Sequence, residues 1–184
     1  LTDCRLSLFE RLLSNFKTDH GYDPRYVYML TRQGRMHRDI AEFPNYAFYG
    51  NRLEVVPLHH QTLPIETCHS QNGIEQMLRT RRIAFVAAQK PRAAASVKTN
   101  QVEAEMIAAT VVQIYNICKD RFDESQTVGV IVPYRNQIAT IRGAIDRYGI
   151  DVLHNITIDT VERYQGSQRD YIIYSFTAKH KYQL

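Results

Sequence analysis

The sequence lacks the glycine-rich loop with which many nucleotide-hydrolysing domains hold phosphate groups. That loop has the pattern G-x-x-x-x-G-K-[ST], and none of the eight glycines in this chain is followed by lysine. The one Asp-Glu pair, Asp123-Glu124, follows a largely polar stretch rather than an apolar strand. It is therefore a poor candidate for a magnesium-binding carboxylate. By itself the chain contains no credible ATPase centre.

Cysteine pairs, membrane-length apolar runs and a signal peptide are absent as well. Cys4, Cys68 and Cys118 lie far apart and form no C-x-x-C pair, so we expect reduced thiols rather than a disulfide framework. The most apolar stretches are only as long as a strand, and no signal-peptide pattern opens the chain. We therefore expect a cytoplasmic protein, or a nuclear one in a eukaryote.

The charge and the histidines add little on their own. A net charge of +4 and an isoelectric point near 9.0 permit a polyanionic partner. The spacing of His59, His60, Cys68 and His69 matches no common structural zinc site. We predict no metal site in this chain.

Apolar segments with the lengths of strands alternate with segments of helical periodicity. We expect strands over residues 26–30, 83–87, 128–132, 156–158 and 171–174, and helices beginning at Ser7 and Asn100, over 38–43 and over 136–148. Pro44 is expected to end the helix over 38–43. Residues 50–80 are expected to be an irregular insertion. The alternation indicates one α/β domain over residues 1–184, with an open, mostly parallel sheet flanked by helices.

Three segments carry a recognisable pattern, and they occur in a fixed order. Residues 30–37, followed by Phe43-Pro44-Asn45 and Phe48-Tyr49, resemble L-x-x-Q-Y-R-M-H…F-P-N…F-Y. Residues 130–137 resemble a strand that ends in T-P-Y-x-x-Q, and residues 158–175 resemble V-D-T-V-x-x-F-Q-G-x-E-x-D-x-I-I-x-S. Together the chain resembles superfamily 1 helicases of the nonsense-decay and replication-helicase type.

The resemblance implies a RecA-like fold, that of the second motor domain of such a helicase. In that family the phosphate loop and the magnesium carboxylates belong to the first motor domain, which would hold most of the ATP and its Mg²⁺. A later family motif would lie beyond Leu184, so the chain is expected to be a fragment. Alone it is not expected to hydrolyse ATP.

The resemblance also implies a nucleotide-facing set in this chain. Arg35 matches the family's catalytic arginine finger, which stabilises charge on the transferred phosphate. Gln33, Gly34, Gly166 and Gln168 match neighbouring positions that face the nucleotide. Two of these depart from the family, which commonly has tyrosine where Gly34 stands and glutamate where Gln168 stands. Both departures weaken the expected grip on the nucleotide. A surface pair between Arg35 and Asp39 is the alternative role for the arginine.

Two further loops match the family's contacts to single-stranded nucleic acid. Pro133, Tyr134 and Gln137 follow a strand at the end where open α/β sheets bind ligands. Thr160 and Val161 match a loop that contacts phosphate. By resemblance, Gln165 couples that second loop to the ATP cleft. Tyr134 and Tyr164 could equally be core aromatics. DNA is slightly favoured over RNA as the partner.

Two other classes of function stay open at this point. One is a non-catalytic nucleic-acid-binding module of the same fold, which the missing phosphate loop and Gly34 favour. The other is a metal-dependent nuclease that uses Asp159, Glu162 and Asp170, for which we expect no cleavage activity.

Overall fold

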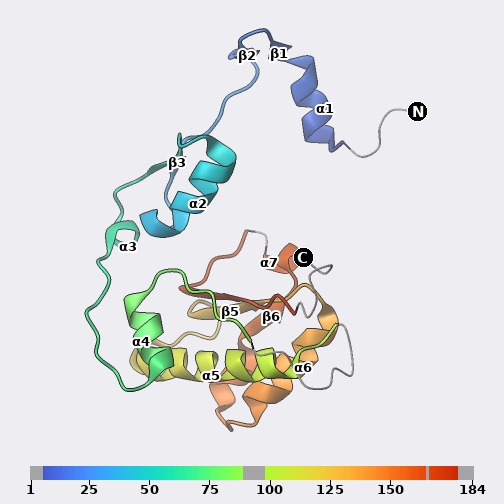
Figure 1. Ribbon diagram of the computed structural model, residues 1–184. Coiled ribbons are helices and arrows are strands. Elements are labelled where there is room, and N and C mark those ends of the chain that lie inside the picture. Colours follow the sequence, from blue (N-terminus) through green and yellow to red (C-terminus); the bar gives the residue numbers. More distant parts are fainter. Residues whose placement is uncertain (1–5, 89–97, 165, 178–184) are drawn as a thin grey trace. The chain divides into compact units, whose positions relative to one another are not determined.

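The computed structural model describes residues 6–88, 98–164 and 166–177 (Figure 1). The chain divides into two compact units, residues 1–64 and residues 65–184, each with its own elements. The interpretation of residues 1–184 as one domain with an irregular insertion stays a prediction.

The first unit opens with helix α1, Leu8–Asn15. The Ser7 hydroxyl accepts a hydrogen bond from the Glu10 backbone N–H at 3.1 Å, and the Glu10 carboxylate accepts one from the Ser7 N–H at 2.8 Å. This reciprocal pair is the capping box that the sequence predicts. A short antiparallel hairpin of β1, Lys17–Thr18, and β2, Gly21–Tyr22, follows the helix.

The prediction of a buried strand over residues 26–30 is wrong. The carbonyl of Asp23 accepts hydrogen bonds from the N–H groups of Tyr26 and Val27, at 3.1 and 3.0 Å, so a turn uses donors that a strand would need. Tyr28 and Leu30 are 83% and 76% exposed. The segment has strand-like composition, but within the described residues it pairs with no neighbouring strand.

A two-stranded parallel sheet forms a few residues later. It pairs β3, Arg32–Gln33, with β4, Glu54–Val55, and places Gln33 opposite Val55. Helix α3, His59–Thr62, follows β4 after three residues. The sheet and α3 therefore bring residues 32–36 close to residues 54–61.

Helix α2, Arg38–Tyr49, runs through Pro44 instead of stopping there, so that prediction is also wrong. Pro44 removes only one intrahelical donor, and side-chain bonds on its far side support the second half of the helix. The Asn45 amide accepts from the Leu53 N–H at 2.7 Å and donates to the Leu53 carbonyl at 3.0 Å. Gly50, in the left-handed conformation with φ +56°, ends the helix.

Three parallel strands form the sheet of the second unit, in the order β6-β5-β7 (Figure 1). They are β5, Val128–Ile131, β6, Thr157–Asp159, and β7, Tyr171–Tyr174. In the centre, Val130 lies opposite Ile158 on one side and Ile173 on the other. All three were predicted, to within a residue at each end, and the α/β fold class with a parallel sheet is confirmed.

Helices surround this sheet. They are α4, Gly73–Thr80; α5, Gln101–Cys118; α6, Arg135–Asp146; the short α7, Val161–Tyr164; and the 3₁₀ turns η1, Lys119–Arg121, and η2, Asp151–Asn155. The predicted N-cap of α5 is confirmed, because the Asn100 side chain accepts from the Glu103 N–H at 3.2 Å. The helix predicted over 136–148 is confirmed as α6, with Gly149 beyond its end at φ +63°.

The core of the second unit lies between the sheet and helices α5 and α6, which lie side by side (Figure 1). Val128 and Val130 of β5 belong to one buried cluster with Val111 and Ile114 of α5 and Ile141 of α6. Since side chains alternate along a strand, Gly129 faces the opposite side of the sheet.

The prediction of a strand over residues 83–87 is wrong. Ile83 is 60% exposed and Phe85 79%, and the segment pairs with no strand of the described chain. Phe85 instead contacts the edge of Phe176, with ring centroids 5.9 Å apart. Residues 90–99 have a basic, alanine-rich sequence, which indicates a connection without turn chemistry, and most of them lie outside the described residues. Among the helices that the structure describes, none has both the length and the apolar character of a membrane span.

Candidate functional site

The candidate arginine finger, Arg35, lies in a four-residue loop between β3 and α2. Its side chain is exposed. The Gln33 side-chain oxygen accepts hydrogen bonds from the backbone N–H groups of Arg35, at 3.0 Å, and Met36, at 2.8 Å, while its amide nitrogen donates to the Met36 carbonyl at 2.9 Å. The side chain of Gln33 therefore holds the loop closed. Gly34 and Arg35, which were also predicted to face the nucleotide, lie in this loop.

Two residues of α3 bind this loop from the other side. The Gln61 amide nitrogen donates to the carbonyls of Gln33, at 2.9 Å, and Met36, at 3.0 Å. The His60 Nε2 lies 3.2 Å from the Gly34 carbonyl. The backbone around Arg35 is thus fixed by three side chains, of which sequence reasoning identified only Gln33. No local motif marks Gln61, because its partners are 25 and 28 residues away.

Buried His37 joins the loop to helix α2. Its Nδ1 accepts a hydrogen bond from the Asp39 N–H at 3.2 Å and so caps the helix. Since Nδ1 accepts, Nε2 carries the proton and donates to the Leu63 carbonyl at 3.0 Å. The Asp39 carboxylate lies 3.5 Å from both His37 and Arg38. The residues that approach the Asp39 carboxylate are thus the cap residue His37 and the first helical residue Arg38.

Gly34 occupies a position that has room for a larger side chain. A Cβ atom built there would lie 3.5 Å from the nearest heavy atom, Cδ1 of Leu58, which is ordinary van der Waals contact. Its φ also lies outside the left-handed region that favours glycine. The backbone therefore does not require glycine at this position. The difference from the family's tyrosine removes a side chain and its contacts, and is not a response to backbone strain.

The two predicted nucleic-acid loops lie together at the carboxyl edge of the parallel sheet. The Val132 N–H donates to the Asp159 carbonyl at 3.0 Å, which places the end of β5 beside the end of β6. Pro133 is exposed and Tyr134 is half-buried at the start of α6. Thr160 is half-buried and Val161 is 57% exposed at the start of α7. Four of the five predicted contact residues therefore share one edge.

Gln137, the fifth predicted contact residue, has no exposed surface. Its side-chain oxygen accepts from the Asn100 N–H at 2.8 Å, and its nitrogen donates to the Asn100 carbonyl at 3.0 Å. The amide thus ties the start of α5 to the first turn of α6. In this structure the Gln137 side chain is enclosed and bonded to the Asn100 backbone, so it does not reach the surface.

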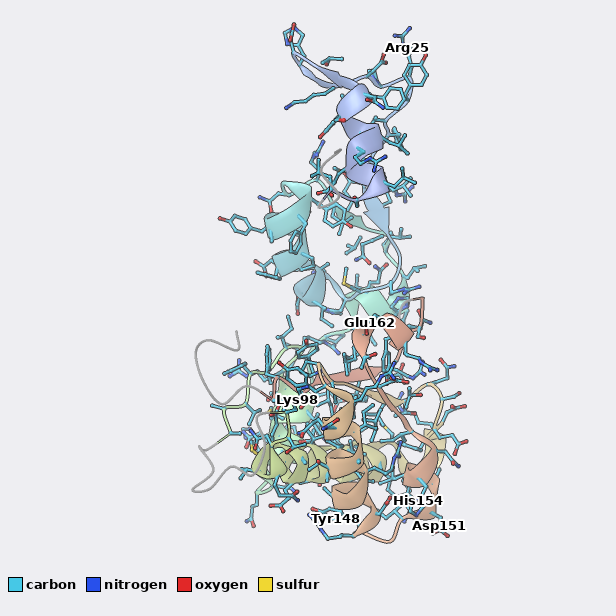
Figure 2. The ribbon with its side chains drawn as sticks, turned by 90° about the vertical axis from the view of Figure 1, so that its right-hand side faces the viewer. Arg25, Lys98, Tyr148, Asp151, His154 and Glu162 are labelled. Carbon is cyan, nitrogen blue, oxygen red and sulfur yellow. The ribbon has the colours of Figure 1, made fainter. Side chains whose placement is uncertain are left out.

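The carboxylates at this edge are engaged by neighbouring groups. Asp159 Oδ1 accepts from the Thr160 N–H at 2.8 Å, and its Oδ2 lies 3.7 Å from Arg163. Glu162 lies on α7 (Figure 2). Hydrogen bonds from the Thr160 side chain and from its own backbone N–H, with attraction from Arg135, hold the pKa of Glu162 below its ordinary value. Arg135, exposed at the first position of α6, is a cation that sequence reasoning did not single out.

Tyr164 belongs to the interior of the fold. Its hydroxyl donates to the Thr157 carbonyl at 2.6 Å, and burial raises the pKa of this hydroxyl above its ordinary value. The ring lies against Gly129, where an added Cβ would be 2.8 Å from its Cε1. The guanidinium of Arg169 lies 5.7 Å from the ring centroid. Of the two readings left open for Tyr164, the structure supports core packing.

The remaining predicted residues follow α7. Gln165, the predicted coupling residue, lies outside the described residues. Gly166 has φ +84°, a conformation that side chains other than glycine rarely adopt. Gln168 is exposed, and its carbonyl accepts a hydrogen bond from Arg169 at 2.7 Å.

A strained residue beyond β7 completes the carboxyl edge. Thr177 has no exposed surface, yet its φ is +57°, which is unfavourable for a β-branched residue. Its N–H donates to the Glu103 carboxylate, at 3.0 Å from Oε2 and 3.3 Å from Oε1. In the sequence Glu103 is recognisable only as the third residue of α5, next to its cap. Its bond to Thr177 is not predictable there, because the two residues are 74 positions apart.

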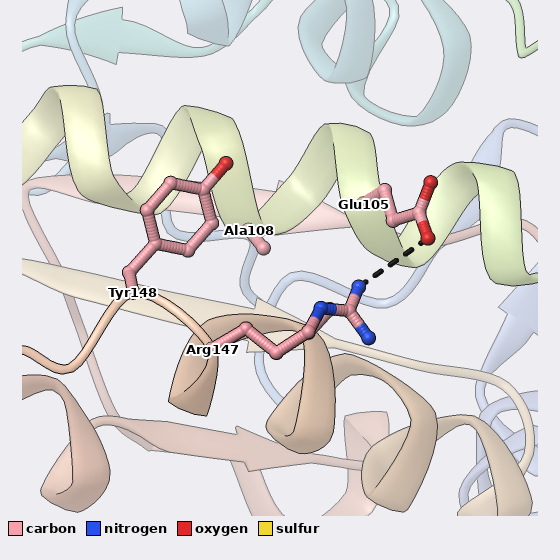
Figure 3. Close-up of a pocket in the computed structure, with 5 residues that line it drawn as sticks. Glu105, Ala108, Arg147 and Tyr148 are labelled. Carbon is pink, nitrogen blue, oxygen red and sulfur yellow. Dashed lines mark hydrogen bonds and ion pairs between the residues drawn. The ribbon is translucent and has the colours of Figure 1, made fainter.

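A cavity of the second unit lies elsewhere, between α5 and α6 (Figure 3). Its volume is about 310 Å³. Glu105 and Arg147, which form an ion pair at 3.3 Å, line it together with Ala108, Ala144 and Tyr148. None of the predicted site residues lines it. The predicted site is therefore an exposed edge and an exposed loop, and not this cavity.

The chain matches a known protein family over nearly its whole length. Residues 4–183 match the family described as AAA domain. Helicase sen1 of Schizosaccharomyces pombe is 30% identical over 175 residues, which are 92% of this chain and 9% of that protein.

Other relatives have similar names. The DNA replication ATP-dependent helicase/nuclease JHS1 of Arabidopsis thaliana is 31% identical over 179 residues, 93% of this chain and 12% of that protein. An uncharacterized ATP-dependent helicase of Methanocaldococcus jannaschii, MJ0104, is 25% identical over 180 residues, 95% of this chain and 24% of that protein. The chain thus spans between 9% and 24% of the length of these three relatives.

Proposed function

The chain belongs to the AAA domain family as a helicase-type domain of superfamily 1, and we propose that it is the second motor domain of an ATP-dependent helicase. The observation that carries the proposal is the loop of Arg35. An exposed guanidinium stands on a backbone that Gln33, His60 and Gln61 hold by hydrogen bonds.

The chemistry of ATP hydrolysis gives such an arginine its use. The transferred phosphoryl group spreads negative charge over its equatorial oxygens in the transition state, and an arginine supplied from outside the phosphate-binding loop stabilises that charge. A rigid planar guanidinium suits phosphate oxygens. In this proposal ATP and Mg²⁺ are held mainly by a first motor domain of the same protein. In the first unit Arg35, with Gln33 and Gly34 beside it, would contact the nucleotide. In the second unit Gly166 and Gln168 are the proposed nucleotide contacts.

The carboxyl edge of the sheet would contact single-stranded nucleic acid. Pro133, Tyr134, Thr160 and Val161 lie at that edge with exposed or half-buried side chains. Contacts to backbone and base faces are independent of sequence, so they suit a motor that steps along a strand. We assign Gln137 an indirect role, in which its bonds to Asn100 hold the first turn of α6 against the start of α5. Gln165 would couple this edge to nucleotide, and DNA is the slightly favoured substrate.

The direct test is Arg35→Ala in the full-length protein. ATP turnover stimulated by nucleic acid should fall by about 10³-fold or more, while affinity for single-stranded nucleic acid stays nearly intact. Arg38→Ala is the matched control. The Arg38 side chain is 68% exposed on the adjoining helix, and its substitution removes the same charge. Turnover that is unchanged in Arg35→Ala, or reduced equally in both variants, would remove the finger assignment.

A non-catalytic nucleic-acid-binding module is the second candidate. Two features favour it: the chain has no phosphate loop, and Gly34 cannot stack on a nucleotide base. The gene sequence ahead of residue 1 separates the two candidates. A G-x-x-x-x-G-K-[ST] loop encoded there excludes the module, and its absence from the whole reading frame excludes the motor.

A further inference from the structure

Gln61 is completely buried in a unit whose other described residues are mostly exposed. Among the described residues of the first unit, only Ala41, His37 and Gln61 are buried, and Gln61 alone has no exposed surface. Glutamine is rarely enclosed in this way unless its amide is used. The contacts of this side chain therefore indicate what it is for.

Both hydrogens of the Gln61 amide point at the loop of Arg35. They reach the Gln33 carbonyl, at 2.9 Å, at the end of β3 just before the loop, and the Met36 carbonyl, at 3.0 Å, within the loop. The orientation of the amide is determined, because exchanging its oxygen and nitrogen would set an acceptor against two acceptors. One side chain thus closes the span that carries Arg35.

The same orientation leaves the Gln61 Oε1 buried without a hydrogen-bond partner in the described structure. An unpartnered buried acceptor is unfavourable. Such a cost persists where another requirement fixes the group, and here that requirement is the pair of loop carbonyls. His60 adds a third bond to the same loop, at the Gly34 carbonyl.

We propose that Gln61, assisted by His60, is a positioning residue that sets the Arg35 loop for contact with the transferred phosphoryl group; this rests on the proposed function. Gln61 does not touch nucleotide or nucleic acid, since it has no exposed surface. It acts through the loop backbone. A displacement of about 1 Å at a reacting group costs on the order of 100-fold in rate, so the position of the loop matters to the chemistry.

The test is Gln61→Glu in the full-length protein. This substitution keeps the shape of the side chain but replaces the donating nitrogen by a carboxylate oxygen, which would face the two carbonyls. We expect kcat for ATP to fall about 10–100-fold, with KM for ATP and affinity for nucleic acid little changed. His60→Ala should give a smaller fall in kcat. His60 is exposed, so we expect this variant to fold.

Matched controls separate positioning from general damage. Thr62→Val alters an exposed residue of the same short helix, and Gln71→Glu makes the same chemical change at an exposed glutamine. Both should keep the parental kcat. If Gln61→Glu does not fold, Gln61→Met removes the donors without adding charge and should show the same loss of kcat. A folded Gln61→Glu or Gln61→Met variant with parental kcat overturns the inference.

The combination of Gln61→Glu with Arg35→Ala decides the mechanism. If Gln61 acts through Arg35, the double variant should be no slower than Arg35→Ala alone. A further fall of the full size overturns the positioning role while leaving the finger intact. Unchanged turnover in Arg35→Ala alone overturns the proposed function itself, so the two failures are distinguishable.

Discussion

Residues 65–184 bury a continuous cluster of apolar side chains between the sheet and helices α5 and α6. In the described part of residues 1–64, the buried side chains are instead one alanine, Ala41, and two polar groups, His37 and Gln61. Both polar groups bond to backbone carbonyls across more than 24 residues of sequence. The second unit is ordered by burial of apolar surface, and the first by hydrogen bonds from side chain to backbone.

This difference suits the functions proposed for the two units. The burial of apolar surface does not depend on direction. An apolar core therefore suits a sheet whose edge loops are proposed to make and release contacts along single-stranded nucleic acid. Hydrogen bonds depend on distance and angle, so they hold one short loop in one geometry. The loop of Arg35 should therefore respond to the exchange of single atoms, and the sheet to changes of volume.

The largest expected effect contrasts apolar truncations in the two units. Ile114→Ala, at a residue with no exposed surface, should lower the free energy of unfolding of the second unit by about 2–5 kcal/mol. Phe43→Ala, at a residue 67% exposed on α2, should change the stability of the first unit by about 0.5 kcal/mol or less. Urea denaturation, with hydrogen exchange at β5 and α2 amides as local probes, measures both. Comparable losses would break the comparison.

A smaller effect is expected from adding one methyl group to the sheet. Gly129→Ala would place Cβ 2.8 Å from Cε1 and 3.0 Å from Cζ of Tyr164, and overpacking of this kind costs about 1–3 kcal/mol. Thermal unfolding should show the loss. Gly143→Ala, in the middle of α6 with open space around it, should instead stabilise the chain by about 0.5–1 kcal/mol. Equal effects at the two glycines would show that contact with Tyr164 does not decide the fit.

The smallest expected effect concerns pH, and it has opposite signs in the two units. Hydrogen bonds from the backbone and hydroxyl of Ser7 hold the pKa of Glu10 below 4.5, so the stability they give α1 is present above that value and lost as pH falls through the folded pKa. Burial raises the pKa of Tyr164 above 10.0, so its contribution is present below that value and lost as pH rises through the folded pKa.

NMR chemical shifts of α1 and β5 across a pH titration would sharpen this contrast. Glu10→Gln should abolish the acid transition of α1 without altering the alkaline transition near β5, and Tyr164→Phe should do the reverse. An acid transition of α1 that persists in Glu10→Gln would contradict the assignment.

The sequence predicted best the features that depend on neighbouring residues. The capping box of Ser7 and Glu10, the Asn100 cap and the three strands of the parallel sheet follow from short patterns. It predicted worst the strands over 26–30 and 83–87, because β-rich composition forms a strand only where another strand offers a partner. Pro44 was misjudged for a related reason, since Asn45 supports the helix through the distant Leu53.

The candidate site divides along the same line. Its residue types and their order, with Arg35 ahead of Pro133-Tyr134 and Thr160-Val161, are visible in the sequence. The burial of Gln137 and Gln61 is not visible there, nor is the bond of Glu103 to Thr177.

The sequence alone determined the helix caps, the three central strands and the residues that identify the family, because each rests on spacing within a few positions. Only the tertiary structure decided which polar side chains face outward and which hold the backbone. Those bonds join residues 25 to 74 positions apart, and their partners are backbone carbonyls and N–H groups, which every residue possesses and no sequence pattern distinguishes.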